Sequence, residues 1–188
     1  DFGPKVNFKK RKIQLGPFHG FPDFTKSLVD RLTQILVDFK PVELCHLEYV
    51  PSRGSAIDPH VDDTWLWGER LVTVNLLSDT VLTLSPVLYA ENHIRLEGHN
   101  QYNSSHDNNK VNIALRVPLT RRSLFVLAGP LRHSWTHQIL RDDVTSRRLA
   151  MTFRELSLEF TPGGQFEKHG QEMLFIAKRF VSFASHSN

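Results

Sequence analysis

Cysteine is almost absent from this sequence of 188 residues, because Cys45 is the only one. A single thiol excludes an intramolecular disulfide and a cysteine-rich zinc site within these residues. The scarcity of cysteine favours a reducing, intracellular setting. The sequence also lacks any apolar run near the roughly 20 residues that a membrane-spanning helix needs, so we expect no membrane association.

Net charge is low as well, because 23 lysines and arginines stand against 20 aspartates and glutamates, which gives +3. This balance is unlike that of a protein that coats nucleic acid. One basic cluster near the start has the composition of either a phosphate-binding surface or a solvated arm; it comprises Lys5, Lys9, Lys10, Arg11 and Lys12. We interpret residues 1–22 as a solvated N-terminal basic arm. The sequence starts without an initiator methionine or a signal peptide, so we expect it to be a piece of a longer chain.

Hydrophobic residues make up 40% of the sequence and charged residues 23%, which is ordinary for a globular protein with one packed domain. Between residues 23 and 39, apolar side chains recur every three or four positions, which predicts a helix with one apolar stripe. The stripe consists of Phe24, Leu28, Leu32, Ile35, Leu36 and Phe39. Pro22 and Pro41 are suitable boundaries of this helix.

After Pro41 the pattern changes to short runs typical of β-strands. These runs cover residues 44–50, 71–77, 81–84, 111–117, 123–128 and 148–153. One helix followed by six strands predicts an α+β domain over residues 23–166, with a β-sandwich or jelly-roll core. The polar stretch 85–110 predicts a loop or lid, and residues 167–188 predict a closing helix and tail on the same domain. We expect a monomer.

Histidine is abundant, with ten residues, and His60 and Asp62 form a His-x-Asp triplet. Such a triplet is weak evidence alone, but residues two apart at a strand end point the same way and can hold one cation. The candidates for a third ligand are His93, His99, His106, His133, His137 and His169. We favour His137, because it follows a predicted strand and a Gly-Pro turn. Two imidazoles and one carboxylate are the ligand set of non-haem Fe(II) oxygenases, although a catalytic zinc site of a hydrolase also fits.

Two arginines help to distinguish an Fe(II) oxygenase from a zinc hydrolase. Arg148 and Arg154 are six residues apart, and this even spacing places both on one face of a strand. Two cations on an apolar strand are costly unless each meets an anion, and a dicarboxylate supplies two. The alternative is that both arginines pair with Asp142 and Asp143 or line the surface.

In combination, these residues resemble the AlkB family of Fe(II)- and 2-oxoglutarate-dependent dioxygenases. The resemblance rests on His60-Val61-Asp62, His137 and the paired arginines, the second of which ends Met151-Thr152-Phe153-Arg154. The string from Gly54 to Asp63, followed by Trp65-Leu66-Trp67-Gly68-Glu69-Arg70, is similar in particular to the branch of the fourth mammalian homologue. The resemblance covers roughly residues 44–156, and the combined order of its motifs is specific where each part is not.

The resemblance implies a double-stranded β-helix (jelly roll) with flanking helices that holds iron through His60, Asp62 and His137. It also implies that Arg148 binds the far carboxylate of 2-oxoglutarate and that Arg154 reaches the carboxylate that chelates the metal.

Tyr49 stands where the family places a tyrosine near the cosubstrate. Two positions depart from the family pattern: Leu47 replaces the asparagine of its Asn-x-Tyr, and Ala150 replaces the asparagine usual two residues after the first arginine.

Three residues just beyond the metal-binding triplet are candidates for the substrate entrance, namely Asp63, Trp65 and Trp67. A tryptophan face suits a methylated base or a methylammonium group. The alternatives are that both tryptophans belong to the core and that Asp63 is a turn residue.

The activity implied by the resemblance is oxidative N-demethylation with Fe(II), 2-oxoglutarate and O2, in which the methyl group leaves as formaldehyde. The implied substrates are monomethyl-lysine in a protein, with actin as the example, and N6-methyladenine in DNA. Low net charge and the lack of an evident basic groove favour the protein. The implied location is cytoplasmic and nuclear. An alternative of another class is a non-catalytic, cupin-like metal-binding scaffold, which would not need the two arginines.

Overall fold

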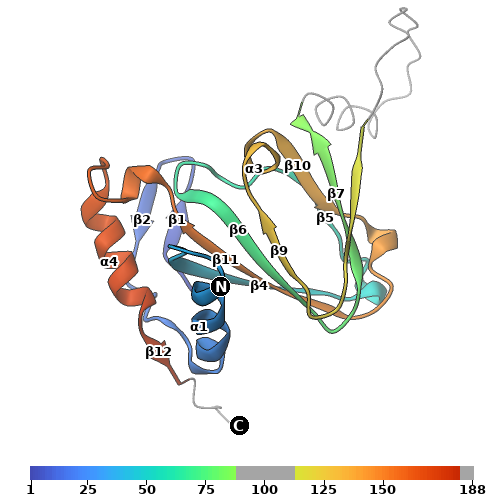
Figure 1. The fold of residues 1–188 in the computed structure, drawn as a ribbon, viewed down its shortest axis with the longest axis horizontal. Coiled ribbons are helices and arrows are strands. Elements are labelled where there is room, and N and C mark those ends of the chain that lie inside the picture. The colour runs from blue at the N-terminus through green and yellow to red at the C-terminus, as the bar shows by residue number, and fades with distance from the viewer. Residues whose placement is uncertain (88–112, 183–188) are drawn as a thin grey trace, which may run out of the picture.

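The computed structural model describes residues 1–87 and 113–182, and its centre consists of two four-stranded antiparallel sheets (Figure 1). The larger sheet contains, in spatial order, β4 (Pro41–Tyr49), β11 (Arg148–Leu156), β6 (Trp67–Leu76) and β9 (Leu124–Leu127). The smaller sheet contains β5 (Ile57–His60), β10 (Trp135–Ile139), β7 (Thr80–Pro86) and β8 (Leu115–Leu119). This mixed, mainly antiparallel architecture agrees with the predicted α+β class and β-sandwich.

All six predicted strands form, and two further strands, β5 and β10, complete the smaller sheet. Local propensity does not predict β5, because aspartate and proline are rare in strands. The whole of β5 reads Ile-Asp-Pro-His. Its pairing with β10 supplies the β-structure that local propensity does not.

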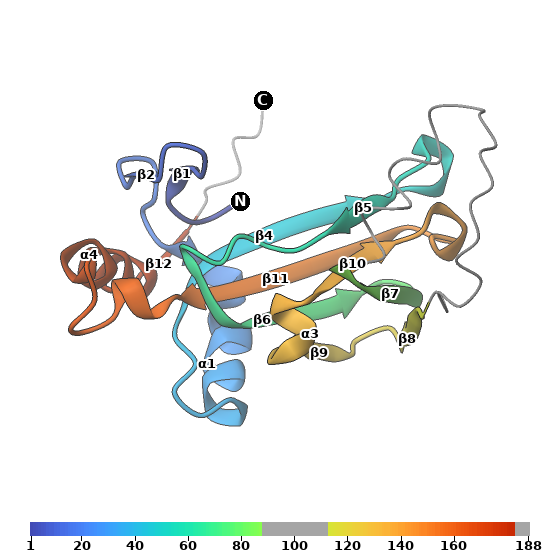
Figure 2. The same cartoon turned by 90° about the horizontal axis from the view of Figure 1, so that it is seen from above.

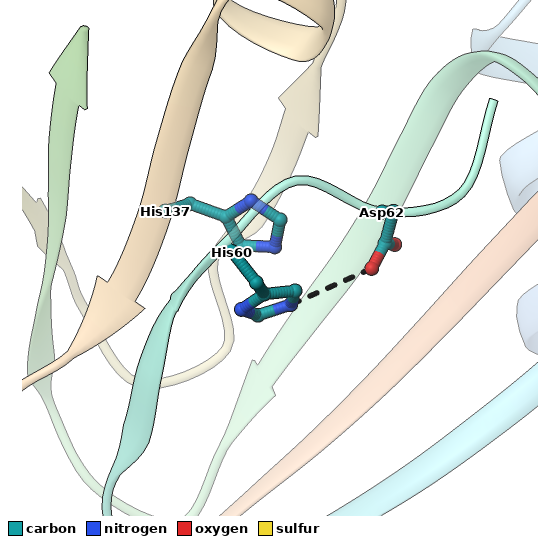
Figure 3. A group of neighbouring side chains, drawn as sticks. All are labelled: His60, Asp62 and His137. Atoms are coloured by element: carbon teal, nitrogen blue, oxygen red, sulfur yellow. Dashed lines mark ion pairs between the residues drawn. The ribbon is translucent and has the colours of Figure 1, made fainter. Parts of the chain in front are cut away.

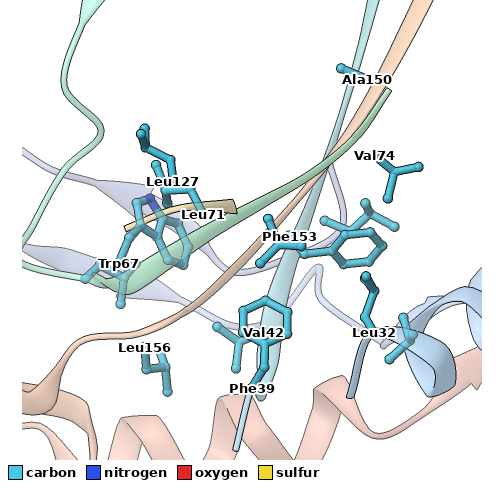
Figure 4. Packing of buried hydrophobic residues seen from close by; sticks show 14 of the residues in the cluster. Leu32, Phe39, Val42, Trp67, Leu71, Val74, Leu127, Ala150, Phe153 and Leu156 are labelled. Atoms are coloured by element: carbon cyan, nitrogen blue, oxygen red, sulfur yellow. The ribbon is translucent and has the colours of Figure 1, made fainter. Parts of the chain in front are cut away.

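Strand β11 divides the two layers of the core. Its side chains alternate, so that Arg148, Ala150, Thr152 and Arg154 face the space between the sheets. Phe153 lies on the opposite face, fully buried among Leu32, Val42 and other apolar side chains (Figure 4). The strand is therefore polar toward the smaller sheet and apolar toward the helices.

Helix α1 (Lys26–Ile35) follows a 3-10 turn, η1 (Asp23–Thr25), where a single helix was predicted over 23–39. The helix ends earlier, because Leu36 is already extended, with φ of -105° and ψ of 98°. Asp38 then adopts a left-handed conformation with φ of 59°, and Phe39 after it is buried in the core. The predicted apolar stripe is wrong at two positions, since Phe24 and Ile35 are 68% and 55% exposed.

The apolar pattern after Glu167 predicts a closing helix that extends to residue 183, but the helix ends at Ala177. Helix α4 (Glu167–Ala177) is followed by the short strand β12 (Phe180–Val181), which pairs in parallel with β3 (Phe21–Pro22). This pairing joins segments from the two ends of the chain. Figures 1 and 2 show α1, α4 and β12 gathered beside one half of the larger sheet, while the smaller sheet lies over the other half.

Residues 1–22, predicted as a solvated basic arm, have exposed lysines but are also attached to the domain. Strands β1 (Lys5–Asn7) and β2 (Lys12–Gln14) form a hairpin whose lysines are exposed. Phe18 and Phe21, however, are buried in the core. The cations are solvated as expected, but the apolar residues around them fix the segment to the domain.

The remaining short elements are η2 (Pro51–Arg53), α3 (Pro130–His133), η3 (Arg141–Asp143) and η4 (Leu158–Phe160). Among the described residues, no helix has the length and apolar character needed to cross a membrane. Most of the predicted loop over 85–110 lies outside the described residues.

Candidate active site

A cavity lies between the two sheets and is lined by side chains from all eight of their strands. It contains about 600 Å³ of space free of protein atoms, part of it open to solvent. This volume is within the usual range for small-molecule sites. Its polar and charged lining residues are Tyr49, His60, Asp62, Thr73, His137, Arg148, Thr152 and Arg154, and most of the other lining residues are apolar.

Sheet pairing brings the two histidines together. His60 at the end of β5 and His137 in β10 are direct cross-strand partners, with ring centroids 4.2 Å apart. Asp62 comes from the loop after β5, and Figure 3 shows its carboxylate directed toward the His60 ring. One donor atom from each of these three residues lies within 4.8 Å of the others. The three predicted ligands therefore converge on one point.

Hydrogen bonding and burial prepare these donor atoms for a cation. Nδ1 of His60 donates to the carbonyl oxygen of Asp58 at 2.8 Å, which orients the ring so that Nε2 faces the Asp62 carboxylate. Burial, followed by the charge of His60, lowers the pKa of His137 to about 4, which keeps its ring neutral at neutral pH. Neutral imidazole is the form that binds a metal.

Asp62 is ionised for a different reason. Burial alone would raise its pKa, but the hydrogen bond with His60 and the charge of Arg154 outweigh burial and hold the pKa of Asp62 well below its usual range. Nε2 of His60 lies 3.5 Å from Oδ1 of Asp62. Two imidazoles and one carboxylate in this arrangement fit a divalent metal such as iron.

Arg154 lies between two carboxylates beside the histidines. Its Nε donates to Oδ2 of Asp62 at 2.8 Å, and its Nη1 donates to Oε2 of Glu43 at 2.5 Å. All three side chains are at most 15% exposed. The protein itself therefore supplies the anions for this cation, although Asp142 and Asp143 do not.

Arg148 has a different environment, because no carboxylate pairs with it in the described part of the chain. It is 2% exposed, its Nε donates to the side-chain oxygen of Asn75 at 2.6 Å, and its guanidinium lies 4.6 Å from the centre of the Tyr49 ring. Its Nη1 is buried without a hydrogen-bond partner. A buried cation with an unpaired donor at a cavity fits an anionic ligand.

The three residues predicted at the substrate entrance lie elsewhere. Trp65 and Trp67 are 5% and 4% exposed, belong to the apolar core and do not line the cavity. Oδ1 of Asp63 accepts a hydrogen bond from the backbone N–H of Leu66 at 2.9 Å, as a turn residue does. None of the three is among the residues that line the cavity, and their positions agree with the structural alternatives.

The other histidines are not part of this site. His133 pairs with Glu69 at 2.9 Å, and His169 lies on α4 beside Phe166. His93, His99 and His106 lie outside the described residues.

Comparison with known proteins adds independent information. The chain is 47% identical over 192 residues to the protein of Mus musculus named alpha-ketoglutarate-dependent dioxygenase alkB homolog 4, covering 96% of this chain and 63% of the relative. The Homo sapiens protein of the same name is 46% identical, with the same coverage. This chain belongs to the AlkB family.

A further relative of the AlkB chain is the Caenorhabditis elegans protein named DNA N6-methyl adenine demethylase. It is 34% identical over 192 residues, covering 100% of this chain and 58% of the relative. The AlkB chain thus spans about three fifths of the length of these curated relatives. No protein-family model matches the chain.

Three residues of the AlkB site were missed by sequence analysis: Asn75, Glu43 and Arg132. Asn75 is the cross-strand partner of Ala150, and its side-chain nitrogen donates to the carbonyls of Ser78, Leu119 and Thr120. These bonds fix the orientation of the amide, whose oxygen accepts the hydrogen bond from Arg148. No local motif marks any of the three.

Proposed function

We propose that this chain forms the catalytic domain of an Fe(II)- and 2-oxoglutarate-dependent oxidative N-demethylase with a double-stranded β-helix core. The unpaired, buried Arg148 carries the proposal, because it stands in the same cavity as the three convergent donor residues. A scaffold would need neither a charged residue buried without a counter-ion nor an open cavity beside it.

Each residue has a role in this proposal. His60, Asp62 and His137 would hold the iron, and the guanidinium of Arg148 would bind the far carboxylate of 2-oxoglutarate through its free Nη1. Tyr49 packs on that guanidinium and restricts its orientation. The chemistry supplied by the bound iron and cosubstrate is oxidative decarboxylation of 2-oxoglutarate to succinate and CO2, coupled to hydroxylation of an N-methyl group that leaves as formaldehyde.

The proposed substrate is a monomethyl-lysine in a protein, and actin is the example to test. The low net charge supports a protein over a nucleic acid. The name of the C. elegans relative supports the second candidate, N6-methyladenine in DNA. The two mammalian names give no substrate.

Anaerobic spectroscopy tests the cofactors. Fe(II) and 2-oxoglutarate added under argon should give a visible charge-transfer band, which is lost in Arg148→Met and retained in His169→Ala. Absence of the band in the wild-type protein would contradict the proposal.

Mass spectrometry then tests the substrate. Methylated actin peptides and methylated oligonucleotides are incubated side by side with the same enzyme, and each is scored for loss of a methyl group. Loss from the oligonucleotide alone would replace the protein candidate by the DNA candidate.

A further inference from the structure

A third buried arginine lies close to the metal-binding residues, and its hydrogen bonds within the described residues go to backbone carbonyls. Arg132 in α3 is 1% exposed and is the largest fully buried side chain of the described chain. Its Nη1 donates to the carbonyl of Asp62 at 2.9 Å, and its Nη2 donates to the carbonyls of Asp63 at 2.8 Å and Trp67 at 3.4 Å. No carboxylate forms an ion pair with it among the described residues.

The segment that Arg132 contacts carries the ligand Asp62 and has no sheet pairing, since residues 61–66 lie between β5 and β6. The far end of this loop is fixed by Ser157, whose N–H donates to the carbonyl of Leu66 at 2.8 Å. At the near end, Arg154 holds the carboxylate of Asp62, whereas Arg132 holds its backbone carbonyl. Arg132 is therefore the side chain that fixes the backbone at the ligand itself.

The same arginine is closely linked to the second half of the site. Helix α3 is separated from β10 by one residue, and His137 lies five residues after Arg132. The outer side of α3 has a separate attachment, because Glu69 accepts hydrogen bonds from the N–H of Gly129 and pairs with His133. His133 and Glu69 are exposed, whereas Arg132 lies inside.

We propose that Arg132 is a positioning residue that sets the distance between the Asp62 loop and the strand of His137, and thereby the affinity for the metal. This inference rests on the proposed metal site. A planar guanidinium has donors in a fixed fork and reaches two neighbouring carbonyls at once, which a lysine ammonium does not. Interactions that orient metal ligands typically change metal affinity by about 10- to 100-fold when removed.

The test uses Mn(II), which needs no reaction to report binding. Mn(II) is titrated into metal-free wild-type protein, Arg132→Met, Arg132→Lys and the control His133→Ala, and free Mn(II) is measured by electron paramagnetic resonance. We expect the dissociation constant to rise about 10- to 100-fold in both Arg132 variants and to stay within about twofold in His133→Ala. Arg132→Lys keeps the charge and carries the test if Arg132→Met does not fold.

Hydrogen exchange of the metal-free proteins separates positioning from general stability. We expect faster exchange in peptides covering residues 60–67 of the Arg132 variants, with β11 unchanged. Folded variants that bind Mn(II) as the wild type does would overturn the inference and leave the proposed function intact. A wild-type protein that binds no Mn(II) would overturn both.

Discussion

The two ends of the cavity contain similar arginines in opposite situations. Arg154 lies between two carboxylates, Asp62 and Glu43, whereas the partners of Arg148 among residues 1–87 and 113–182 are an amide and an aromatic ring. Burial lowers the pKa of Arg148, while at Arg154 burial is outweighed by the two carboxylates, which raise its pKa. One cation is compensated by the protein, and the other is left for a ligand.

This difference modifies the expectation for Arg154. Two of its nitrogens, Nε and Nη1, are already engaged by protein carboxylates. Its first function in this structure is to hold Asp62.

The largest effect is expected at the compensated end. Arg154→Met leaves two buried carboxylates without a cation, so the free energy of unfolding should fall by about 3–5 kcal/mol. Urea denaturation of the metal-free protein measures this change. A second substitution, Glu43→Gln, should recover part of the loss, and failure to recover any would contradict the pairing.

The next effect concerns the uncompensated end. Arg148→Met should weaken 2-oxoglutarate binding about 100-fold, because it removes the charged donor that the described residues place at that end of the cavity. Its free energy of unfolding should not fall as that of Arg154→Met does, since no carboxylate loses a partner. Calorimetry with Mn(II) as the metal measures the binding. A loss of stability as large as that of Arg154→Met would erase the contrast between the two ends.

A smaller effect is expected from a substitution that gives Arg148 a carboxylate partner, as Arg154 already has. Asn75→Asp would give Arg148 a carboxylate of its own, so we expect 2-oxoglutarate to bind about tenfold more weakly than to Asn75→Leu. Both variants lose the three hydrogen bonds from the Asn75 amide, so the comparison isolates the added charge. Equal affinities in the two variants would show that Arg148 is not an anion site.

The smallest effect is the pH dependence of the metal-free protein. With a pKa of about 4 in the folded state and an ordinary value of 6.5, His137 makes the unfolded state take up the proton first, so unfolding becomes easier as pH falls from about 6.5 to 4. His60 acts in the opposite direction, because the hydrogen bond with Asp62 raises its pKa. Denaturation curves with EDTA should therefore show a flatter pH profile for His137→Gln and a steeper one for His60→Gln. Identical profiles in both variants would contradict these environments.

Local pattern was sufficient for much of the fold and for the convergent residues. Even spacing along a strand correctly placed Arg148 and Arg154 on one face, because that periodicity follows from backbone geometry alone. The turn before His137 correctly indicated a sheet position.

Pattern was not sufficient for the partners of those residues. Glu43 meets Arg154 across 111 positions, Asn75 meets Arg148 across 73, and Arg132 meets Asp62 across 70. Such pairs depend on strand order and register, which no short window of sequence contains. The same limit applies to Trp65, because its ring packs in the core against Phe160 from a distant segment.

The histidines stand on the smaller sheet, while both arginines stand on β11 of the larger one. Neither sheet carries the complete site, so a metal ion together with its diacid would link the two sheets. Joint binding of these two ligands would then require both sheets to be packed against each other, as in the final step of folding. Thermal protection by both ligands together should accordingly exceed the sum of their separate effects.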